Sequence, residues 1–378
     1  MAPLHPRPDR NSPASGAGCP SLIRMTKTMN PTRIAVVGAG YIGQAHMAAL
    51  QSGKTVCLSA IGDPSPAAFH IAAKAGVALY PSLEVLLERD RPEALVLATP
   101  TQMHVRQATY CVNAGIPILL EKPIAGTVAE AESLAALVES THAKVLIGHH
   151  RAHSPIMATA CEVVQSGRLG RLVSVMGSAL FFKPDQYFVD GPWRREPGGG
   201  PVLLNMIHEV HNLRMLCGDI VAVQAFSSNE TRGFAVEDTV AINLRFANGT
   251  LGTFMLSDTA ACARSWEQTA QENKAYTSYD DEDCYVISGT AGTLSVPTMR
   301  LKTYATREDS SWWKPFEVGV LDIVRDDPIK LQMEHFGAVV RGEAQPIVSA
   351  RDGLENLRVT EAIVQAAKTG QTVHIRSR

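Results

Sequence analysis

The sequence has no long uninterrupted apolar run, although 45% of its 378 residues are hydrophobic. No segment approaches the ~20 apolar residues that a membrane-spanning helix needs, so a spanning chain is not expected. A block of basic residues is also missing, and 35 Lys and Arg stand against 37 Asp and Glu. Because the net charge is only −2, neither nucleic acid nor a lipid surface is an expected partner.

The seven cysteines are widely spaced, and no two of them form a Cys-x-x-Cys pair. An odd number of scattered cysteines is typical of free thiols in a reducing compartment. We therefore expect a cytoplasmic location.

Residues 1–30 contain five prolines among Ser, Gly and Arg, and they lack the apolar centre of a signal peptide. This composition is typical of a disordered tail. Met25 and Met29 are alternative start positions, so we expect residues 1–30 to be either a disordered tail or a mis-assigned start.

Hydrophobic patterning changes near residue 150. Before it, short apolar runs alternate with helical segments, which predicts βαβ units and a parallel sheet. After it, residues 240–246 alternate apolar and polar, and Asn248-Gly249 supplies a tight turn, which predicts antiparallel hairpins. We expect an α/β protein with a Rossmann domain over 31–150 and an α+β domain over 151–378, the latter with a large, mostly antiparallel open sheet. The expected strands are 34–37, 55–61, 95–98, 116–120, 144–147, 171–180, 220–227, 240–246, 251–256, 284–288 and 293–296, and the expected helices are 41–52, 66–75, 82–89, 155–166, 201–217 and 351–369.

Residues 38–43 read Gly-Ala-Gly-Tyr-Ile-Gly and lie between a predicted strand and a predicted helix. In this G-x-G-x-x-G context the first glycine makes a tight turn, the second lets the backbone approach a pyrophosphate, and the third lets helix and strand pack closely. The free N–H groups of the helix then face the phosphates. The pattern predicts a dinucleotide site rather than a plain surface turn.

Asp63 follows the second predicted strand, twenty residues after Gly43. A carboxylate there accepts hydrogen bonds from the adenosine ribose and repels a 2′-phosphate. No arginine follows in the Pro-Ser-Pro of residues 64–66 to bind that phosphate. The expected cofactor is therefore NAD, with NADP less favoured.

Three further segments occur together with the glycine-rich turn: residues 98–104 (Ala-Thr-Pro-Thr-Gln-Met-His), residues 121–123 (Glu-Lys-Pro) and the triple glycine 198–200 followed by His208. The set resembles the glucose-fructose oxidoreductase, inositol dehydrogenase and rhizopine-catabolism (Gfo/Idh/MocA) family over about residues 32–375. The resemblance implies a Rossmann domain, an open antiparallel substrate domain, and homodimers or homotetramers packed through its sheet. The residues expected at the cofactor are Gly38, Gly40, Tyr41, Ile42, Gly43, Asp63, Thr99, Pro100, Thr101, His104, Glu121, Lys122, Trp193 and Arg194.

Lys122 follows a buried strand, where a lysine can either reach out to water or stand beside the nicotinamide at the carboxyl edge of the sheet. The family's Glu-Lys-Pro lysine lies in the active site, so the resemblance implies a catalytic Lys122. A cation there polarises the reacting oxygen.

His208 falls in the predicted helix 202–217, on one face with Asn205 and Asn212. A helical histidine is often structural, but the resemblance implies that this one is the general acid/base, which suits an imidazole. Many relatives carry an aspartate four residues earlier, where this chain has Leu204. Asn205 is expected to orient His208 or a substrate hydroxyl, and His211 replaces another aspartate that is common in the family.

Three other features have two readings each. In relatives a Trp-Arg pair approaches the cofactor, which fits Trp193 and Arg194, although a surface loop fits as well. Arg151 begins the second domain and either binds substrate or braces the junction of the domains. Residues 265–276 are polar and aromatic, which fits a lid over the substrate or an interface loop.

No metal site is expected. The candidate ligands are His149, His150, His153, His208, Glu209 and His211. Helical zinc pairs are usually spaced His-x-x-x-His, whereas His208 and His211 are three residues apart with no supporting cysteine.

The expected function is an NAD-dependent dehydrogenase that oxidises a secondary alcohol of a sugar, inositol or related polyol. In this hypothesis His208 takes the proton, Lys122 stabilises the alkoxide, and hydride passes to the nicotinamide. The substrate residues would be Lys122, Arg151, Asn205 and His208. Two alternatives stay open, since fold alone does not decide function: a lyase or glycosidase that oxidises its substrate only transiently, and a non-enzymatic regulator that binds NAD and sugar.

Overall fold

The computed structural model describes residues 30–375. The expected tail therefore lies outside the described residues, apart from Asn30. The chain from Pro31 onward forms one unit. Within residues 30–375, no helix is long and apolar enough to cross a membrane.

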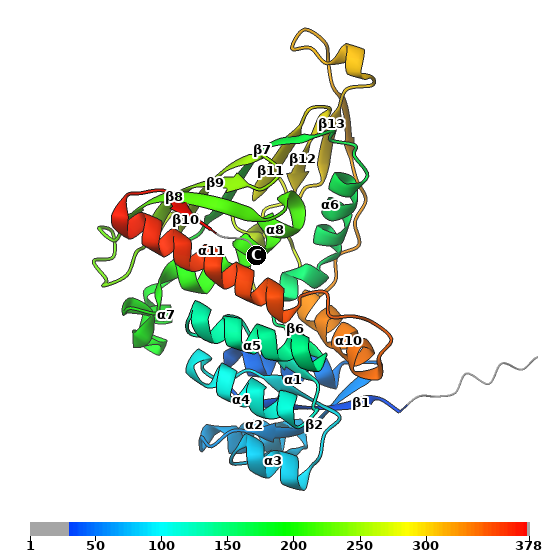
Figure 1. Cartoon of the computed structure of the whole chain (residues 1–378), viewed down its shortest axis with the longest axis vertical. Coiled ribbons are helices and arrows are strands. Elements are labelled where there is room, and N and C mark those ends of the chain that lie inside the picture. The colour runs from blue at the N-terminus through cyan, green and yellow to red at the C-terminus, as the bar shows by residue number, and fades with distance from the viewer. Residues whose placement is uncertain (1–29, 376–378) are drawn as a thin grey trace, which may run out of the picture. The chain divides into compact units, whose positions relative to one another are not determined.

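The first sheet has six strands, all paired in parallel, as the apolar runs before residue 150 predict (Figure 1). The strand order is β3-β2-β1-β4-β5-β6, so the order reverses between β1 and β4, which is where ligands bind in such sheets. The strands are β1 (Thr32–Val37), β2 (Val56–Gly62), β3 (Ala78–Tyr80), β4 (Ala94–Leu97), β5 (Ile118–Leu120) and β6 (Val145–Ile147). Every residue of β4, β5 and β6 is buried, which explains their uninterrupted apolar sequence.

Helices cover both faces of this sheet, and the side chains of Ser82 and Thr127 cap two of them by accepting backbone N–H bonds. The helices are α1 (Tyr41–Gln51), α2 (Ala67–Ala75), α3 (Leu83–Arg89), α4 (Thr101–Asn113) and α5 (Val128–Thr141). The chain also returns to this core late in the sequence. Met333 and Phe336 of α10 (Pro328–Arg341) and Leu354 of α11 (Ala350–Thr369) pack among its buried side chains. Helix α10 was absent from the sequence-based expectations.

The second sheet has nine strands in the order β14-β13-β12-β11-β7-β10-β9-β8-β15. All neighbours are antiparallel except β7 and β10, so the expectation of a mostly antiparallel sheet is confirmed. Both expected hairpins form, β9 with β10 and β11 with β12. The strands are β7 (Leu172–Leu180), β8 (Ile220–Ser228), β9 (Thr239–Phe246), β10 (Leu251–Ser257), β11 (Tyr285–Gly289), β12 (Gly292–Val296), β13 (Arg300–Thr303), β14 (Glu317–Val320) and β15 (Val373–His374).

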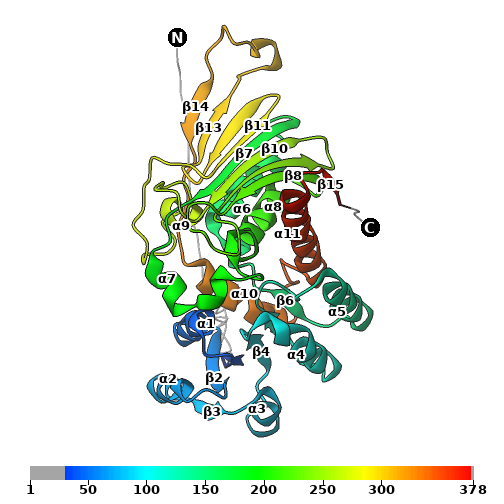
Figure 2. The same ribbon diagram turned by 90° about the vertical axis from the view of Figure 1, so that its left-hand side faces the viewer.

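One face of this sheet is covered by α6 (Pro155–Gln165), α8 (Ile207–Cys217) and α11, which Figure 2 shows on the same side. Helix α11 lies between β8 and α5 and so contacts both layers of the molecule. The other face exposes Met176 of β7 and Leu251 and Met255 of β10. Short helices α7 (Asp185–Asp190) and α9 (Trp266–Thr269) lie in the connections.

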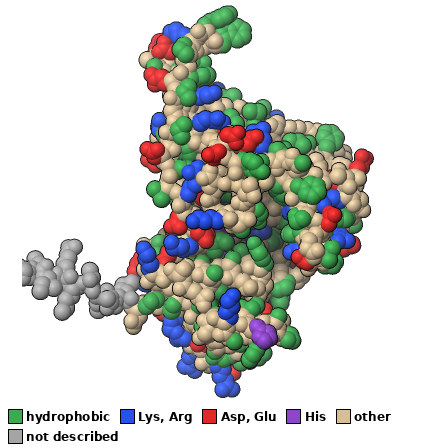
Figure 3. Space-filling model, turned by 180° about the vertical axis from the view of Figure 1, so that it is seen from behind, with side chains coloured by type: hydrophobic (Ala, Val, Ile, Leu, Met, Phe, Trp, Pro, Cys, Tyr) green, Lys and Arg blue, Asp and Glu red, His purple; other side chains and the backbone are tan. Residues whose placement is uncertain are grey.

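An arm projects from the sheet edge around β13 and β14. All four residues of β14 are exposed, and hydrophobic side chains gather at the end of the arm (Figure 3). Trp312 is 85% exposed and Trp313 is 83% exposed. Such side chains are costly in water, so the arm presents an unpaired apolar surface.

Candidate active site

The glycine-rich turn has the geometry that a dinucleotide requires. Gly38 has φ +100°, and a Cβ there would come within 2.4 Å of the Ala98 carbonyl oxygen. A Cβ on Gly43 would lie 1.9 Å from the Gly38 carbonyl oxygen, whereas a Cβ on Gly40 would meet nothing within 4 Å. Gly38 and Gly43 are therefore needed for packing, and Gly40 faces open space where a ligand can approach.

The first turn of α1 leaves its backbone donors free, because Gly40 at the N-cap supplies no side-chain cap. Asp63 stands beside it and accepts hydrogen bonds from the backbone N–H of Ala39 (2.7 Å) and of Ser65 (2.8 Å). Burial raises the pKa of Asp63, but hydrogen bonds from Ser65 and Ala39 outweigh it, so the net pKa is lowered. The free amides, the open Gly40 and an ionised Asp63 fit NAD.

Glu121, which follows β5, and His46 of α1 form a buried contact next to this turn. His46 Nε2 lies 2.7 Å from Glu121 Oε1, and both side chains are buried. His104 Nδ1 and Nε2 lie 2.8 Å from the carbonyl oxygens of Pro123 and Thr99, so both ring nitrogens are occupied by backbone. His104 thus braces the two loops that carry the candidate cofactor residues.

Lys122 follows β5, and its Nζ donates a 3.1 Å hydrogen bond to the carbonyl oxygen of Leu204. Among residues 30–375, no carboxylate lies within ion-pair distance of that ammonium group. Burial is the largest influence on Lys122 and lowers its pKa, which Glu121 opposes and Arg151 reinforces. A lysine in this state exchanges a proton more readily than one in water.

His208 lies in the first turn of α8, directly after a π-helical turn, Val202–Met206. The expected helix 202–217 is confirmed, with its first turn wider than an α-helix; π turns are frequent at functional sites. The His208 ring is buried, and its Nδ1 has no hydrogen-bond partner among the described residues. Burial, reinforced by the Lys122 and Arg151 cations, holds the pKa of His208 well below its usual 6.5.

A cleft of about 1870 Å³ joins the glycine-rich turn to these two side chains. The expected site residues that line it are Tyr41, Ile42, Thr99, Pro100, Thr101, Glu121, Lys122, Trp193 and His208. His150, which sequence reasoning considered only as a metal ligand, also lines it. One continuous space therefore runs from the dinucleotide turn to the Lys122 and His208 pair.

Other expected site residues have different surroundings. Arg151 is buried and forms ion pairs with Glu209 (2.6 Å) and with Glu267. Arg194 NH1 donates to the Tyr187 carbonyl oxygen (2.5 Å), and its guanidinium lies 3.9 Å from the centre of the Tyr187 ring. Both arginines make internal contacts, and neither is among the residues that line the cleft.

Lys183 was missed by sequence reasoning. Its Nζ donates to Asn205 Oδ1 (2.7 Å) and lies 3.6 Å from Asp258. Burial, opposed by Asp258, lowers the pKa of Lys183 to about 8. The available signal was a lysine shortly after a predicted strand, similar to the position after a strand that drew attention to Lys122.

Segment 265–276 has buried side chains that pack inside the second domain, so it is more than a lid or a surface loop. Trp266 is buried, its indole N–H donates to Glu272 (3.0 Å), and Glu267 pairs with Arg151. Tyr276 stays 45% exposed. Within the described chain, no three His, Cys, Asp or Glu side chains are arranged to hold a metal ion.

Comparison with known proteins assigns both halves of the chain. Residues 32–149 match the family model described as an oxidoreductase family with an NAD-binding Rossmann fold, and residues 157–295 match the GFO/IDH/MocA C-terminal domain. Together these matches cover more than half of the sequence.

Individual relatives span most of the chain at low identity. The 1,5-anhydro-D-fructose reductase of Ensifer adhaerens is 25% identical over 305 residues, 78% of this chain and 83% of the relative. The inositol 2-dehydrogenase of Rhizobium meliloti is 22% identical over 91% of this chain and 99% of the relative. The WlbA dehydrogenase from Bordetella pertussis, solved with NADH and UDP-GlcNAcA, has a TM-score of 0.73 at 22% identity and covers 92% of this chain and 100% of its own. The chain therefore belongs to the Gfo/Idh/MocA family of oxidoreductases, which have an NAD-binding Rossmann fold.

Proposed function

We propose that this protein is an NAD-dependent dehydrogenase that oxidises a secondary alcohol of a sugar, an inositol or a related polyol. The observation that carries the proposal is the cleft itself. It starts at Tyr41 and Ile42 of the dinucleotide turn and contains Lys122 and His208, the groups suited to an alcohol oxygen.

The nicotinamide of bound NAD would supply the hydride acceptor. The residues that would hold the cofactor are those of the glycine-rich turn, Asp63 at the adenosine ribose, and Thr99, Pro100 and Thr101 at the neighbouring strand end. Lys122 and His208 would bind the alcohol oxygen from one wall of the cleft. Burial lowers the pKa of each, which favours the neutral amine and the neutral imidazole next to that oxygen.

Asp63 supports NAD over NADP. Its carboxylate is kept ionised by two backbone N–H donors, and an ionised carboxylate at the ribose repels a 2′-phosphate. The substrate class is supported by relatives named inositol 2-dehydrogenase and D-apiose dehydrogenase, which are 22% and 23% identical to this chain.

We also place the enzyme in the cytoplasm as a homodimer or homotetramer. The uncovered face of the nine-stranded sheet supports the assembly, since it exposes Met176, Leu251 and Met255 together on adjacent strands. Light scattering on the purified protein tests this, and a monomer at micromolar concentration would contradict it.

The direct test of the activity is NADH formation from a panel of inositols, aldoses and sugar acids, with NAD⁺ and NADP⁺ in parallel. Net NADH from one group of polyols is the expected result. Substrate turnover without net NADH would instead indicate the transient oxidation of a lyase or glycosidase. Tight NAD binding with no turnover across the panel would indicate a regulator.

A further inference from the structure

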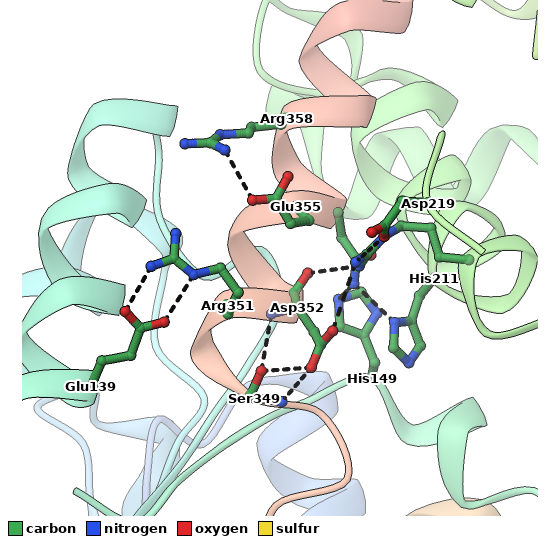
Figure 4. A network of polar contacts seen from close by, with 11 residues as sticks. Glu139, His149, His211, Asp219, Ser349, Arg351, Asp352, Glu355 and Arg358 are labelled. Atoms are coloured by element: carbon green, nitrogen blue, oxygen red, sulfur yellow. Dashed lines mark hydrogen bonds and ion pairs between the residues drawn. The ribbon is translucent and has the colours of Figure 1, made fainter. Parts of the chain in front are cut away.

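A chain of buried polar side chains leads from α11 to His208. Arg214 NH1 donates to Asn356 Oδ1 (2.7 Å). The Asn356 amide nitrogen lies 3.1 Å from His149 Nε2 and 3.0 Å from His211 Nδ1. Asn356 is completely buried, and Figure 4 shows the rings of His149 and His211 close together next to α11.

The donor and acceptor of each hydrogen bond in this series of side chains follow from Arg214, its first member. A guanidinium can only donate, so the Asn356 atom that faces Arg214 must be the amide oxygen. The amide nitrogen that faces the histidines can then only donate, one hydrogen to each ring. His149 Nε2 and His211 Nδ1 must therefore be unprotonated acceptors. Each neutral ring carries its proton on the other nitrogen, which for His149 is Nδ1.

His149 is in contact with His208. The two rings meet edge to face with their centres 5.8 Å apart, and His149 also stacks on His211 at 4.6 Å. His149 Nδ1 and His208 Nδ1 are both buried without a hydrogen-bond partner among the described residues. Buried polar atoms rarely remain unpaired. No direct hydrogen bond joins these two nitrogens. Because His149 Nδ1 is a donor, an unprotonated His208 Nδ1 is the arrangement that lets one bound water accept from His149 and donate to His208.

We propose that Asn356 is a positioning residue that acts through His149 to keep the proton of neutral His208 on Nε2. His208 then donates a hydrogen bond to the alcohol oxygen, and Lys122 accepts the alcohol proton. This inference rests on the proposed dehydrogenase function and assigns the two roles at its site.

The assignment balances chemically. The alcohol O–H bond breaks and its proton passes to the neutral amine of Lys122, which becomes an ammonium. The oxidised nicotinamide of bound NAD would accept the hydride from the same carbon, which would become a carbonyl. His208 keeps its proton throughout, so no imidazolium forms beside the Lys122 and Arg151 cations. A neutral imidazole can stabilise a developing oxyanion as a donor.

The test is the protonation of His208 itself, which nitrogen NMR of labelled histidines reads directly. The wild-type protein with NAD bound is compared with His208→Gln, whose missing signal assigns the residue. A proton on Nε2 is expected at neutral pH. A proton on Nδ1, or on both nitrogens, overturns the proposal without any reference to activity.

The variant Asn356→Asp completes the test, because it reverses the direction of the hydrogen bond between residue 356 and His149. A carboxylate has no N–H, so His149 must donate from Nε2, and its Nδ1 becomes the acceptor. His208 should then carry its proton on Nδ1, and kcat should fall about 10-fold to 100-fold with NAD affinity unchanged. Asn212→Asp, which changes an equally buried asparagine bonded to the Tyr285 hydroxyl, should leave the His208 signal as in the wild type.

An unchanged His208 tautomer in folded Asn356→Asp would contradict the proposal. If that variant does not fold, the wild-type spectrum still tests the proposal, because a proton on His208 Nδ1 overturns it. If no substrate yields NADH while the wild-type tautomer is as expected, the dehydrogenase function fails and the positioning by Asn356 stands.

Discussion

Lys122 Nζ donates a 3.1 Å hydrogen bond to the carbonyl oxygen of Leu204, and this contact joins the two layers of the molecule at the candidate active site. Lys122 follows the parallel strand β5, whereas Leu204 lies in the π-helical turn that precedes His208. A neutral carbonyl partner orients the amine of Lys122 and leaves its charge free to change. A carboxylate partner would instead hold the amine in its charged form.

Two glycine substitutions separate binding of the cofactor from folding. Gly40→Ala places a methyl group in open space beside the free amides of α1, so NAD affinity should fall about 10-fold while stability stays within ~0.5 kcal/mol. Gly43→Ala clashes with the Gly38 carbonyl oxygen and should lower the free energy of unfolding by about 1–3 kcal/mol. Calorimetric titration and urea unfolding measure both effects. Equal behaviour of the two variants would contradict this division.

Asp63→Asn tests the cofactor preference. The amide oxygen can still accept one backbone N–H, but the charge that repels a 2′-phosphate is lost. The kcat/KM with NAD, divided by the kcat/KM with NADP, should fall about 10-fold to 100-fold. The reason is that the NAD ribose loses a hydrogen bond to a charged group, and such a bond contributes about 1.5–3 kcal/mol. An unchanged ratio in steady-state kinetics would mean that Asp63 does not face the ribose.

The pH dependence should report Lys122 rather than His208. Burial lowers the pKa of Lys122 from its usual 10.5, so the neutral amine that accepts the proton predominates above that lowered pKa and is lost as pH falls through it. The charged and titratable groups around it are Glu121, Arg151, Glu267, Lys183, His104, His149, His150 and His208. The rate of alcohol oxidation should rise with pH along one limb whose midpoint is below 10.5. His208→Gln should lower the plateau and keep this limb; loss of the limb in that variant would make His208 the base.

Arg151→Met should act mainly on stability. The side chain is buried between Glu209 and Glu267, and its removal takes the ion pair from the buried carboxylate of Glu209, which keeps the hydrogen bond from the Tyr285 hydroxyl. We expect a loss of about 3–5 kcal/mol in the free energy of unfolding at neutral pH, partly restored by adding Glu209→Gln. Urea unfolding measures this. A loss below ~1 kcal/mol together with a raised KM would instead place Arg151 at the substrate.

Local chemistry made the first half of the chain predictable. Buried parallel strands are continuous apolar runs, and the turn at residues 38–43 needs glycine for reasons visible in the sequence, as the φ of Gly38 and the Cβ clash at Gly43 confirm. The hairpin at Asn248-Gly249 was predictable for the same reason, since its Gly249 has φ +89°.

Long-range packing was not predictable from these patterns. Helix α10 begins at an Asp327 cap and ends at Gly342, but nothing local shows that it returns to a core built mainly from the first half of the chain. Asn356 meets His149 across 207 residues of sequence, and neither residue stands out in its own segment. Lys183 reaches Asn205 only because the loop after β7 folds back over the π-helical turn.

The most direct test of the account is Lys122→Met, measured for NADH formation and for NAD binding on the same protein. The proton acceptor and one binding group for the oxygen are removed, so kcat should fall at least ~100-fold while the Kd for NAD changes less than about threefold. Lys144→Met is the matched control, because Lys144 also donates its Nζ to a backbone carbonyl, that of Val340, and it should keep wild-type kcat. Equal losses of kcat and NAD affinity in Lys122→Met would contradict the account, since Lys122 would then serve the cofactor and not the alcohol.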